Sequence, residues 1–260
     1  MDTIIFDRVS KLFRHRRPVF DWIGQRRRAE TRALDQVSFS VGAGRILALL
    51  GPNGSGKTTT LKLIATTLLP DAGRVMVEGF DTQKLANQVR KRVGLAMTSE
   101  RSFFPRLSAR ENLEFFAALE EVPRKLRGLR IAAILERTGL AKAADTEVMK
   151  FSSGMYQKLA IARALIKQPS IVLLDEPTRS LDPGAAAQTW DLVRELPGYG
   201  ASVLMATHNF EEASAVADEV ILLDRGRLSG QCKLSGARPV ELRELYFQVI
   251  GQKDEFAISA

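Results

Sequence analysis

The sequence of 260 residues contains no apolar run long enough to cross a lipid bilayer. A membrane-spanning helix needs roughly 18 or more consecutive apolar residues, and the apolar runs here are short segments such as residues 171–174. The chain begins with Met1, Asp2 and Thr3, and Asp2 makes this start acidic where a secretion signal would carry positive charge. We therefore expect a protein that has no membrane anchor of its own and reaches a membrane only through a partner.

Cysteine and histidine are also scarce. Cys232 is the single cysteine, so no internal disulfide can form, which fits a reducing compartment. The two histidines, His15 and His208, lie far apart in the sequence, and neither has a neighbour at the spacing of metal ligands. A zinc or other transition-metal site is therefore not expected. Internal repeats and low-complexity tracts are absent as well.

The formal net charge is +8. Such an excess of positive charge is compatible with binding to nucleic acid or to anionic lipid, or with solubility alone. Much of it lies in residues 14–32, which contain seven arginines against Asp21 and Glu30. The same segment contains an apolar cluster at residues 19–23, and this is the composition of a segment that lies at an interface. The segment is thus either a contact with a membrane surface or a membrane partner, or a solvated loop.

The remaining pattern alternates strands with helices. A helix is expected from Lys57 to about Leu69, just before Pro70. Strands alternating with helices predict an α/β fold with a mainly parallel sheet. The expected strands are residues 4–6, 9–13, 37–41, 45–50, 75–77, 171–174, 203–206 and 220–223.

The middle of the chain interrupts this pattern with helices. Ser108 and Glu111 have the spacing of a capping box at the start of one helix, and a second helix is expected to end at Gly139. We therefore expect a helical lobe at residues 95–165. The other parts are a core at residues 1–94 and 166–235, with residues 14–32 as a basic insertion, and a short helical tail at residues 236–260.

Residues 51–58 form a glycine-rich segment that follows an apolar strand and opens a helix. They match the phosphate-loop pattern, in which backbone N–H groups curl around phosphate oxygens and the helix N-terminus adds positive partial charge. Lys57 would reach the outer phosphates, and the Thr58 hydroxyl would bind Mg²⁺. A chance glycine-rich turn is the alternative. The expected nucleotide-binding residues of this segment are Gly51, Pro52, Asn53, Gly54, Ser55, Gly56, Lys57, Thr58 and Thr59.

A second phosphate-site element is the apolar strand that ends at Asp175 and Glu176. Open α/β sheets place their ligands at the carboxyl ends of strands. Asp175 is expected to hold Mg²⁺, and Glu176 to act as the general base on an attacking water. A plain strand ending in two acids is the alternative. Together with the glycine-rich segment, this element predicts an NTPase without specifying its kind.

Residues 151–157, with the sequence FSSGMYQ, precede an expected helix and resemble the signature of the ABC ATPase family, usually written LSGGQ. Ser152 and Gly154 match the family pattern, whereas Phe151, Ser153 and Met155 depart from it. A serine hydroxyl and backbone N–H groups at a helix start can still bind a γ-phosphate. The resemblance covers residues 1 to about 230. It implies a P-loop NTPase core with a mixed sheet and an inserted α-helical lobe.

The resemblance also implies ATP and Mg²⁺ as cofactors and a second copy of the chain as a partner. In such a head-to-tail pair, ATP lies between the phosphate loop of one copy and Ser152, Ser153, Gly154 and Met155 of the other. Asp182 looks like part of the loop that contacts the second copy. His208 looks like the histidine that contacts the γ-phosphate, and Phe13 like the aromatic that stacks on adenine. A structural histidine and a core phenylalanine are the alternatives.

The resemblance further implies the ATP-hydrolysing subunit of an ABC transporter, held by a separate transmembrane permease at the cytoplasmic face of the membrane. The basic insertion resembles those of ATPases paired with polysaccharide, lipid or drug export permeases, which favours export, and no nucleic acid partner is expected. The alternative is a non-transport ABC ATPase that acts on the ribosome or on DNA. Those proteins generally carry two ATPase units or a long coiled coil, and this sequence has neither. The sequence does not indicate the cargo.

One feature of the family is missing. A glutamine normally follows the phosphate loop and touches both Mg²⁺ and the membrane partner, but residues 97–104 contain none. Thr98, Ser99 and Glu100 are the candidates for its place. Glu100 has the most similar length, and the choice among the three stays open.

Overall fold

The computed structural model describes residues 2–14, 30–97, 102–234 and 239–257. Within these ranges no helix is both long and apolar enough to cross a membrane. The strands are β1 (Asp2–Arg14), β2 (Glu30–Gly42), β3 (Ile46–Leu50), β4 (Ala72–Val77), β5 (Phe80–Asp81), β6 (Val93–Met97), β7 (Ile171–Asp175), β8 (Ser202–Thr207), β9 (Glu219–Asp224) and β10 (Arg227–Lys233). The α-helices are α1 (Lys57–Ile64), α2 (Ala86–Arg92), α3 (Ala109–Leu119), α4 (Arg124–Arg137), α5 (Ser153–Leu165), α6 (Pro183–Glu195), α7 (Phe210–Val216) and α8 (Pro239–Ala257).

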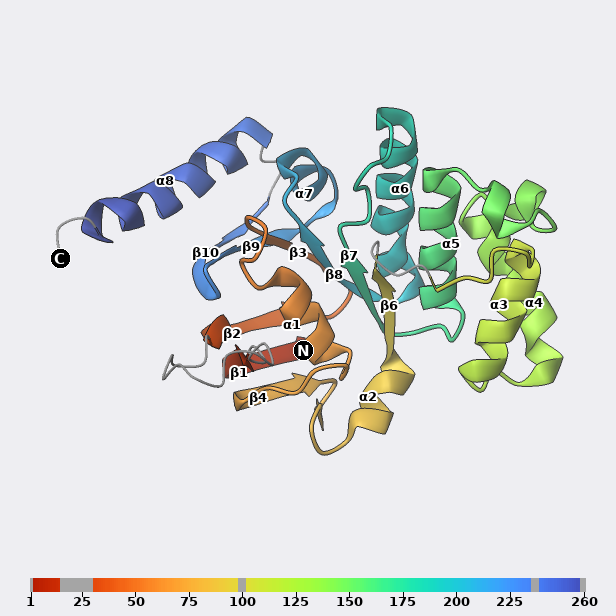
Figure 1. Cartoon of the computed structure of the whole chain (residues 1–260), viewed down its shortest axis with the longest axis horizontal. Helices are drawn as coiled ribbons and strands as arrows, with labels where there is room; N and C mark the ends of the chain where they lie inside the picture. The colour runs from red at the N-terminus through yellow and green to blue at the C-terminus, as the bar shows by residue number, and fades with distance from the viewer. Residues whose placement is uncertain (1, 15–29, 98–101, 235–238, 258–260) are drawn as a thin grey trace, which may run out of the picture.

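The described strands form two sheets (Figure 1). The larger sheet has the order β10-β9-β3-β8-β7-β6, in which β9, β3, β8, β7 and β6 run parallel and β10 pairs antiparallel with β9. Every residue of β3, β7 and β8 is buried, as a parallel sheet covered on both faces requires. The predicted α/β fold with a mixed sheet is confirmed. The first strands, however, form a separate antiparallel sheet of order β2-β1-β4-β5.

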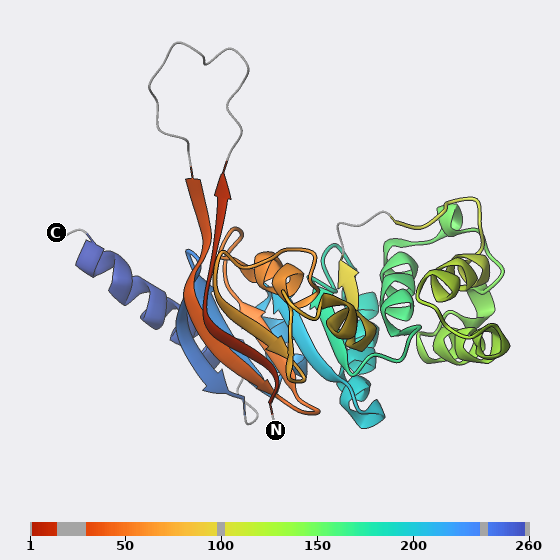
Figure 2. The same ribbon diagram turned by 90° about the horizontal axis from the view of Figure 1, so that it is seen from below.

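The two long strands of the smaller sheet, β1 and β2, form a hairpin paired from Asp2 opposite Gly42 to Arg14 opposite Glu30. Figure 2 shows that its far end extends away from the rest of the molecule. Residues 15–29, most of the basic insertion, lie outside the described residues. The described end of the hairpin is held by an ion pair of 3.1 Å between the side chains of Arg14 and Glu30.

The helices α3, α4 and α5 lie together at one end of the molecule, on the opposite side of the larger sheet from the hairpin (Figures 1 and 2). The predicted capping box is present, because Ser108 Oγ accepts from the Glu111 N–H and the Ser108 N–H donates to Glu111 Oε2. Gly139 follows α4 with a φ of 68°, which favours glycine. The lobe boundary expected at residue 95 falls inside strand β6.

Helix α1 is shorter than predicted. It ends at Ile64, whereas the sequence suggested about Leu69 because of Pro70. Thr66 has a φ of 60°, a left-handed conformation that a helix cannot continue through. The N–H groups of Thr67 and Leu68 both bond back to the Lys62 carbonyl, so a turn closes the helix before the proline.

Candidate active site

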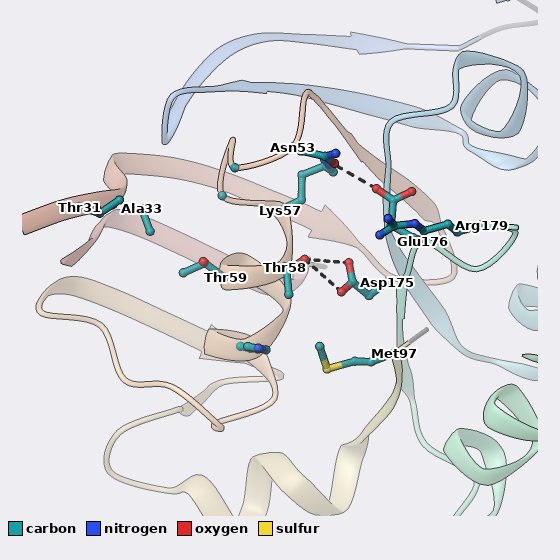
Figure 3. Close-up of a pocket in the computed structure, with 13 residues that line it drawn as sticks. Thr31, Ala33, Asn53, Lys57, Thr58, Thr59, Met97, Asp175, Glu176 and Arg179 are labelled. Carbon is teal, nitrogen blue, oxygen red and sulfur yellow. Dashed lines mark hydrogen bonds and ion pairs between the residues drawn. The ribbon is translucent and has the colours of Figure 1, made fainter. Parts of the chain in front are cut away.

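A cavity of about 400 Å³ opens where β3 and β7 end, at the carboxyl edge of the larger sheet (Figure 3). Strand β3 leads into the glycine-rich loop and α1, and β7 delivers two adjacent carboxylates to the same edge. This is where an open α/β sheet places its ligands. The residues that line the cavity are Thr31, Ala33, Asn53, Gly54, Gly56, Lys57, Thr58, Thr59, Lys62, Met97, Asp175, Glu176 and Arg179.

Two glycines of the loop are required by its close packing. Gly56 has a φ of 109°, and a Cβ there would lie 2.6 Å from both the Ala33 oxygen and Leu34 Cδ2. A Cβ on Gly51 would lie 2.1 Å from the Leu223 oxygen. The loop is thus wedged between β2 and β9, which fixes its curled backbone. Ser55 is buried in it.

Lys57 is the first residue of α1, and its side chain turns back into the loop. Its ammonium donates to the carbonyls of Gly51 and Pro52, at 2.7 and 3.0 Å, and lies 3.8 Å from Glu176 Oε1. Burial lowers the pKa of Lys57, although the carboxylates of Glu176 and Asp175 act in the opposite direction. A buried cation in a glycine-rich loop at a helix start is suited to an anion with several oxygens.

Thr58 and Asp175 come from different elements and meet in the cavity. The Thr58 hydroxyl lies 3.0 Å from each carboxylate oxygen of Asp175 (Figure 3). Burial raises the pKa of Asp175, and the Thr58 hydrogen bond partly offsets that rise. These hard oxygen donors are of the kind that Mg²⁺ prefers.

Glu176 follows Asp175 and contacts His208 at the end of β8. His208 Nδ1 lies 2.6 Å from Glu176 Oε2, and the Glu176 N–H donates to the Ala206 carbonyl at 2.8 Å. Glu176 has a φ of 52°, a backbone angle that residues other than glycine rarely adopt. The side chains of Lys57 and His208 therefore contact the two oxygens of one carboxylate, because β3, β7 and β8 are adjacent strands.

The residues 152–155 and Asp182 lie at helix starts and are not among the residues that line the cavity. Ser152 caps α5 by accepting from the Met155 N–H at 3.2 Å, and Asp182 caps α6 by accepting from the Ala185 N–H at 2.9 Å. Gly154 is buried, and a Cβ on it would approach Ala185 Cβ to 3.2 Å. Ser152 and Ser153 are exposed.

Phe13 lies on β1 with 36% of its surface exposed. It is paired with Thr31 of β2, and directly opposite residues of an antiparallel pair point to the same face. Since Thr31 lines the cavity, the Phe13 ring lies on the face that borders it. Lys11 lies over the same ring, 5.8 Å from its centre.

Several cavity residues were not expected from the sequence. Lys62 lies one turn of α1 beyond Thr58, so helical spacing could have indicated it. Arg179 shares a turn with Glu176, where the Arg179 N–H donates to the Glu176 carbonyl. Thr31 and Ala33 lie on β2 and line the cavity because of the way β2 pairs with β1, and no local sequence pattern indicates that pairing. Thr98, Ser99 and Glu100, the candidates for the missing glutamine, lie outside the described residues.

Comparison with known protein families gives a match between residues 34–179 and the family model described as "ABC transporter". The chain is 39% identical over 204 residues to the daunorubicin resistance ATP-binding protein DrrA3 of Streptomyces coeruleorubidus, an alignment that spans 78% of this chain and 64% of that protein. It is 36% identical over 226 residues to the Nod factor export ATP-binding protein I of Ralstonia nicotianae, spanning 86% and 68%. The chain thus spans about two thirds of these relatives.

Among solved structures, a dimeric, post-hydrolysis ATP-binding cassette, MJ0796, bound to ADP and Pi is similar. It superposes with a TM-score of 0.75 at 26% identity, covering 90% of this chain and 100% of that one. The fold described above, with its parallel sheet, separate antiparallel strands and helical lobe, is therefore the fold of that cassette.

Proposed function

The chain belongs to the ABC transporter family of ATP-binding domains, and on that premise we propose that it is the subunit that hydrolyses ATP to drive a separate permease. The main support is that Lys57, Thr58, Asp175, Glu176 and His208 converge at one edge of the sheet. Phosphoryl transfer is catalysed mainly by positioning and charge neutralisation, and these side chains suit both tasks.

The donor set fits Mg²⁺. Mg²⁺ sites commonly use one or two carboxylates together with substrate phosphates and water, and Thr58 and Asp175 supply a hydroxyl and a carboxylate side by side. A cation there would also favour the charged form of Asp175, which burial disfavours. When bound, Mg²⁺ would neutralise charge on the phosphate oxygens. The proposed metal ligands are therefore Thr58 and Asp175.

In this proposal, the loop N–H groups and Lys57 bind the phosphates and hold the terminal phosphoryl group in line with a water molecule. Glu176 accepts a proton from that water as it attacks. His208 contacts the same carboxylate and therefore orients it. Phe13 supplies a stacking surface for the adenine at the border of the cavity.

A second copy of the chain is the proposed partner at this site. The residues 152–155 and Asp182 do not line the cavity of their own chain, so a nucleotide in that cavity leaves them available to another copy. Ser152 and the first N–H groups of α5 would then bind the γ-phosphate from the opposite side. Head-to-tail pairing gives two such sites for each dimer.

The names of the relatives support a transporter that exports its cargo, because they refer to daunorubicin resistance and to Nod factor export. We propose that a separate permease holds this subunit at the cytoplasmic face of the membrane, and that residues 14–32 contact the membrane surface or that permease. In the proposed division, residues 1–94 and 166–235 form the catalytic core, residues 95–165 the helical lobe and residues 236–260 the tail.

The function is tested by Glu176→Gln, which removes the base but leaves the phosphate loop unchanged. We expect ATP hydrolysis to fall by a factor of about 100 or more, while ATP still binds and dimers accumulate in ATP. Lys57→Ala is the matched control, because it should weaken ATP binding itself. Hydrolysis by Glu176→Gln at near the wild-type rate would show that Glu176 is not the base.

Co-purification tests the cellular role. A transport subunit should co-isolate with a membrane protein, whereas a ribosome- or DNA-directed ATPase should co-isolate with nucleic acid.

A further inference from the structure

A buried acid, Glu212, contacts the turn that follows β7 and takes no part in the mechanism described above. It is in the first turn of α7, is only 1% exposed and accepts a hydrogen bond of 2.6 Å from the Thr178 hydroxyl. Burial raises the pKa of this carboxyl group, and the Thr178 hydrogen bond partly offsets that rise. A buried carboxyl is costly unless it is bonded, so the bond from the Thr178 hydroxyl fixes where the Glu212 carboxyl sits.

Thr178 belongs to the turn that begins with Glu176. Two residues of that turn, Glu176 and Ser180, have positive φ values of 52° and 65°. The turn is closed by the Arg179 N–H donating to the Glu176 carbonyl and the Leu181 N–H to the Thr178 carbonyl. Such backbone conformations persist only where the surroundings hold them, and Thr178, which is 9% exposed, is the buried anchor of this turn.

Glu212 itself is held to the turn that contains His208. The Asn209 side chain accepts from the N–H groups of Glu211 and Glu212, and the Asn209 N–H donates to the Thr207 hydroxyl. The Thr178–Glu212 bond therefore joins the turn after β7 to the turn after β8. The Glu176–His208 contact of 2.6 Å lies between the same two turns.

We propose that Glu212 is a positioning residue that sets the Glu176–His208 contact through Thr178. The proposal rests on the proposed function, since it assigns Glu212 a role in hydrolysis. With two side-chain contacts between the turns, Thr178–Glu212 and Glu176–His208, the Glu176 carboxylate keeps one orientation toward the cavity. Without the Thr178–Glu212 bond, the strained turn relaxes and the carboxylate is displaced.

Kinetics distinguish positioning from a merely structural role. Thr178→Val keeps the shape of the side chain but removes the donor, and Glu212→Ala removes the acceptor. For both we expect kcat to fall roughly 10-fold or more, since small displacements of a catalytic group have effects of this size, while ATP affinity stays within about 2-fold. Thr178→Ser, which keeps the hydroxyl, should restore most of the rate, and the exposed neighbour Glu211→Gln is the matched control.

A second measurement does not depend on turnover. The chain has two histidines, so with His15→Gln the imidazole nitrogen signals of His208 can be read alone by NMR. Thr178→Val and Glu212→Ala should shift the Nδ1 signal toward that of Glu176→Gln, whereas Glu211→Gln should leave it unchanged. An unchanged Nδ1 signal and kcat in Thr178→Val, even with a lowered melting temperature, would overturn the proposal.

Different results would contradict the proposed function and the proposed role of Glu212. If the wild-type chain does not hydrolyse ATP, the proposed function fails. If Glu176→Gln is inactive but Thr178→Val keeps both its rate and its His208 signal, only the role of Glu212 fails.

Discussion

Burial shifts the pKa values of two charged groups of the site, Lys57 and Asp175, in opposite directions. It lowers the pKa of Lys57 and raises the pKa of Asp175, so it disfavours the charged form of each. Phosphate would favour the charged lysine, and Mg²⁺ would favour the charged aspartate. The site is therefore electrostatically costly to the isolated fold, and its ligands offset that cost.

The aspartate gives a prediction for stability against pH. Because the folded state raises the pKa of Asp175 above its ordinary value of 3.8, it favours the protonated form, and the contribution of this group is lost as pH rises through the raised pKa. Asp175→Asn mimics the protonated form. We expect it to raise Tm at neutral pH, without nucleotide or Mg²⁺, by an amount of the order of a few degrees.

Calorimetry at several pH values measures this effect. The gain in Tm should shrink as pH falls towards 3.8, and Asp191→Asn, at an exposed aspartate, is the control. A gain that is absent at neutral pH would show that Asp175 carries no such cost.

Phe13 gives a second prediction at this scale. Its ring is partly exposed on the face that borders the cavity, so Phe13→Ala should remove a stacking surface worth about 1 kcal/mol. We expect the KM for ATP to rise about 5-fold with little change in Tm. A core phenylalanine would instead cost roughly 3 kcal/mol or more of stability and leave KM unaffected, so both quantities are to be measured on one variant.

At the scale of single elements, the starts of α5 and α3 are capped in the same way. Ser152 accepts from Met155 and Ser108 accepts from Glu111, each at 3.2 Å. Removing such a cap costs about 1 kcal/mol of stability. Only Ser152 is proposed to bind a nucleotide held by a second copy. Ser108 is therefore a matched control, which caps a helix in the same way but has no proposed role at the nucleotide.

We expect Ser152→Ala and Ser108→Ala to lower Tm similarly, but only Ser152→Ala to reduce ATP hydrolysis, by roughly 10-fold or more. Steady-state assays well below Tm measure the difference. Equal rates in the two variants would mean that Ser152 serves only as a helix cap.

At the scale of the whole molecule, head-to-tail pairing predicts complementation between two defective chains. Lys57→Ala disables the phosphate loop, and a bulky Ser152→Arg disables the helix start that faces it. A mixed dimer has one intact site, made from the normal loop of one chain and the normal helix start of the other.

Each variant alone should fail to form dimers in ATP, and a mixture should recover them with one tightly bound nucleotide per dimer. Size-exclusion chromatography with labelled ATP measures both quantities. Absence of recovery, with both variants folded, would contradict the head-to-tail arrangement.

The residue pattern alone determined the features that depend on neighbours in sequence. The capping box at Ser108 has a conformation set within a few residues by side-chain-to-backbone bonds. The phosphate loop at residues 51–58 was evident from the spacing of its glycines, although packing against β2 and β9 fixes its backbone. The buried strands β3, β7 and β8 were likewise evident from apolar runs. Helix α1 shows the limit, since Pro70 suggested a later end than the turn at Thr66 allows.

Only the tertiary structure decided which of these segments meet. The pairing of β1 with β2 and β4 in a second sheet brings Thr31 and Ala33 to the cavity. The contact between Thr178 and Glu212 joins turns that are 34 positions apart in the sequence. Strand order and side-chain contacts across such distances depend on chain pairing and packing. A local pattern records which face of a segment is apolar, but it does not record what packs against that face.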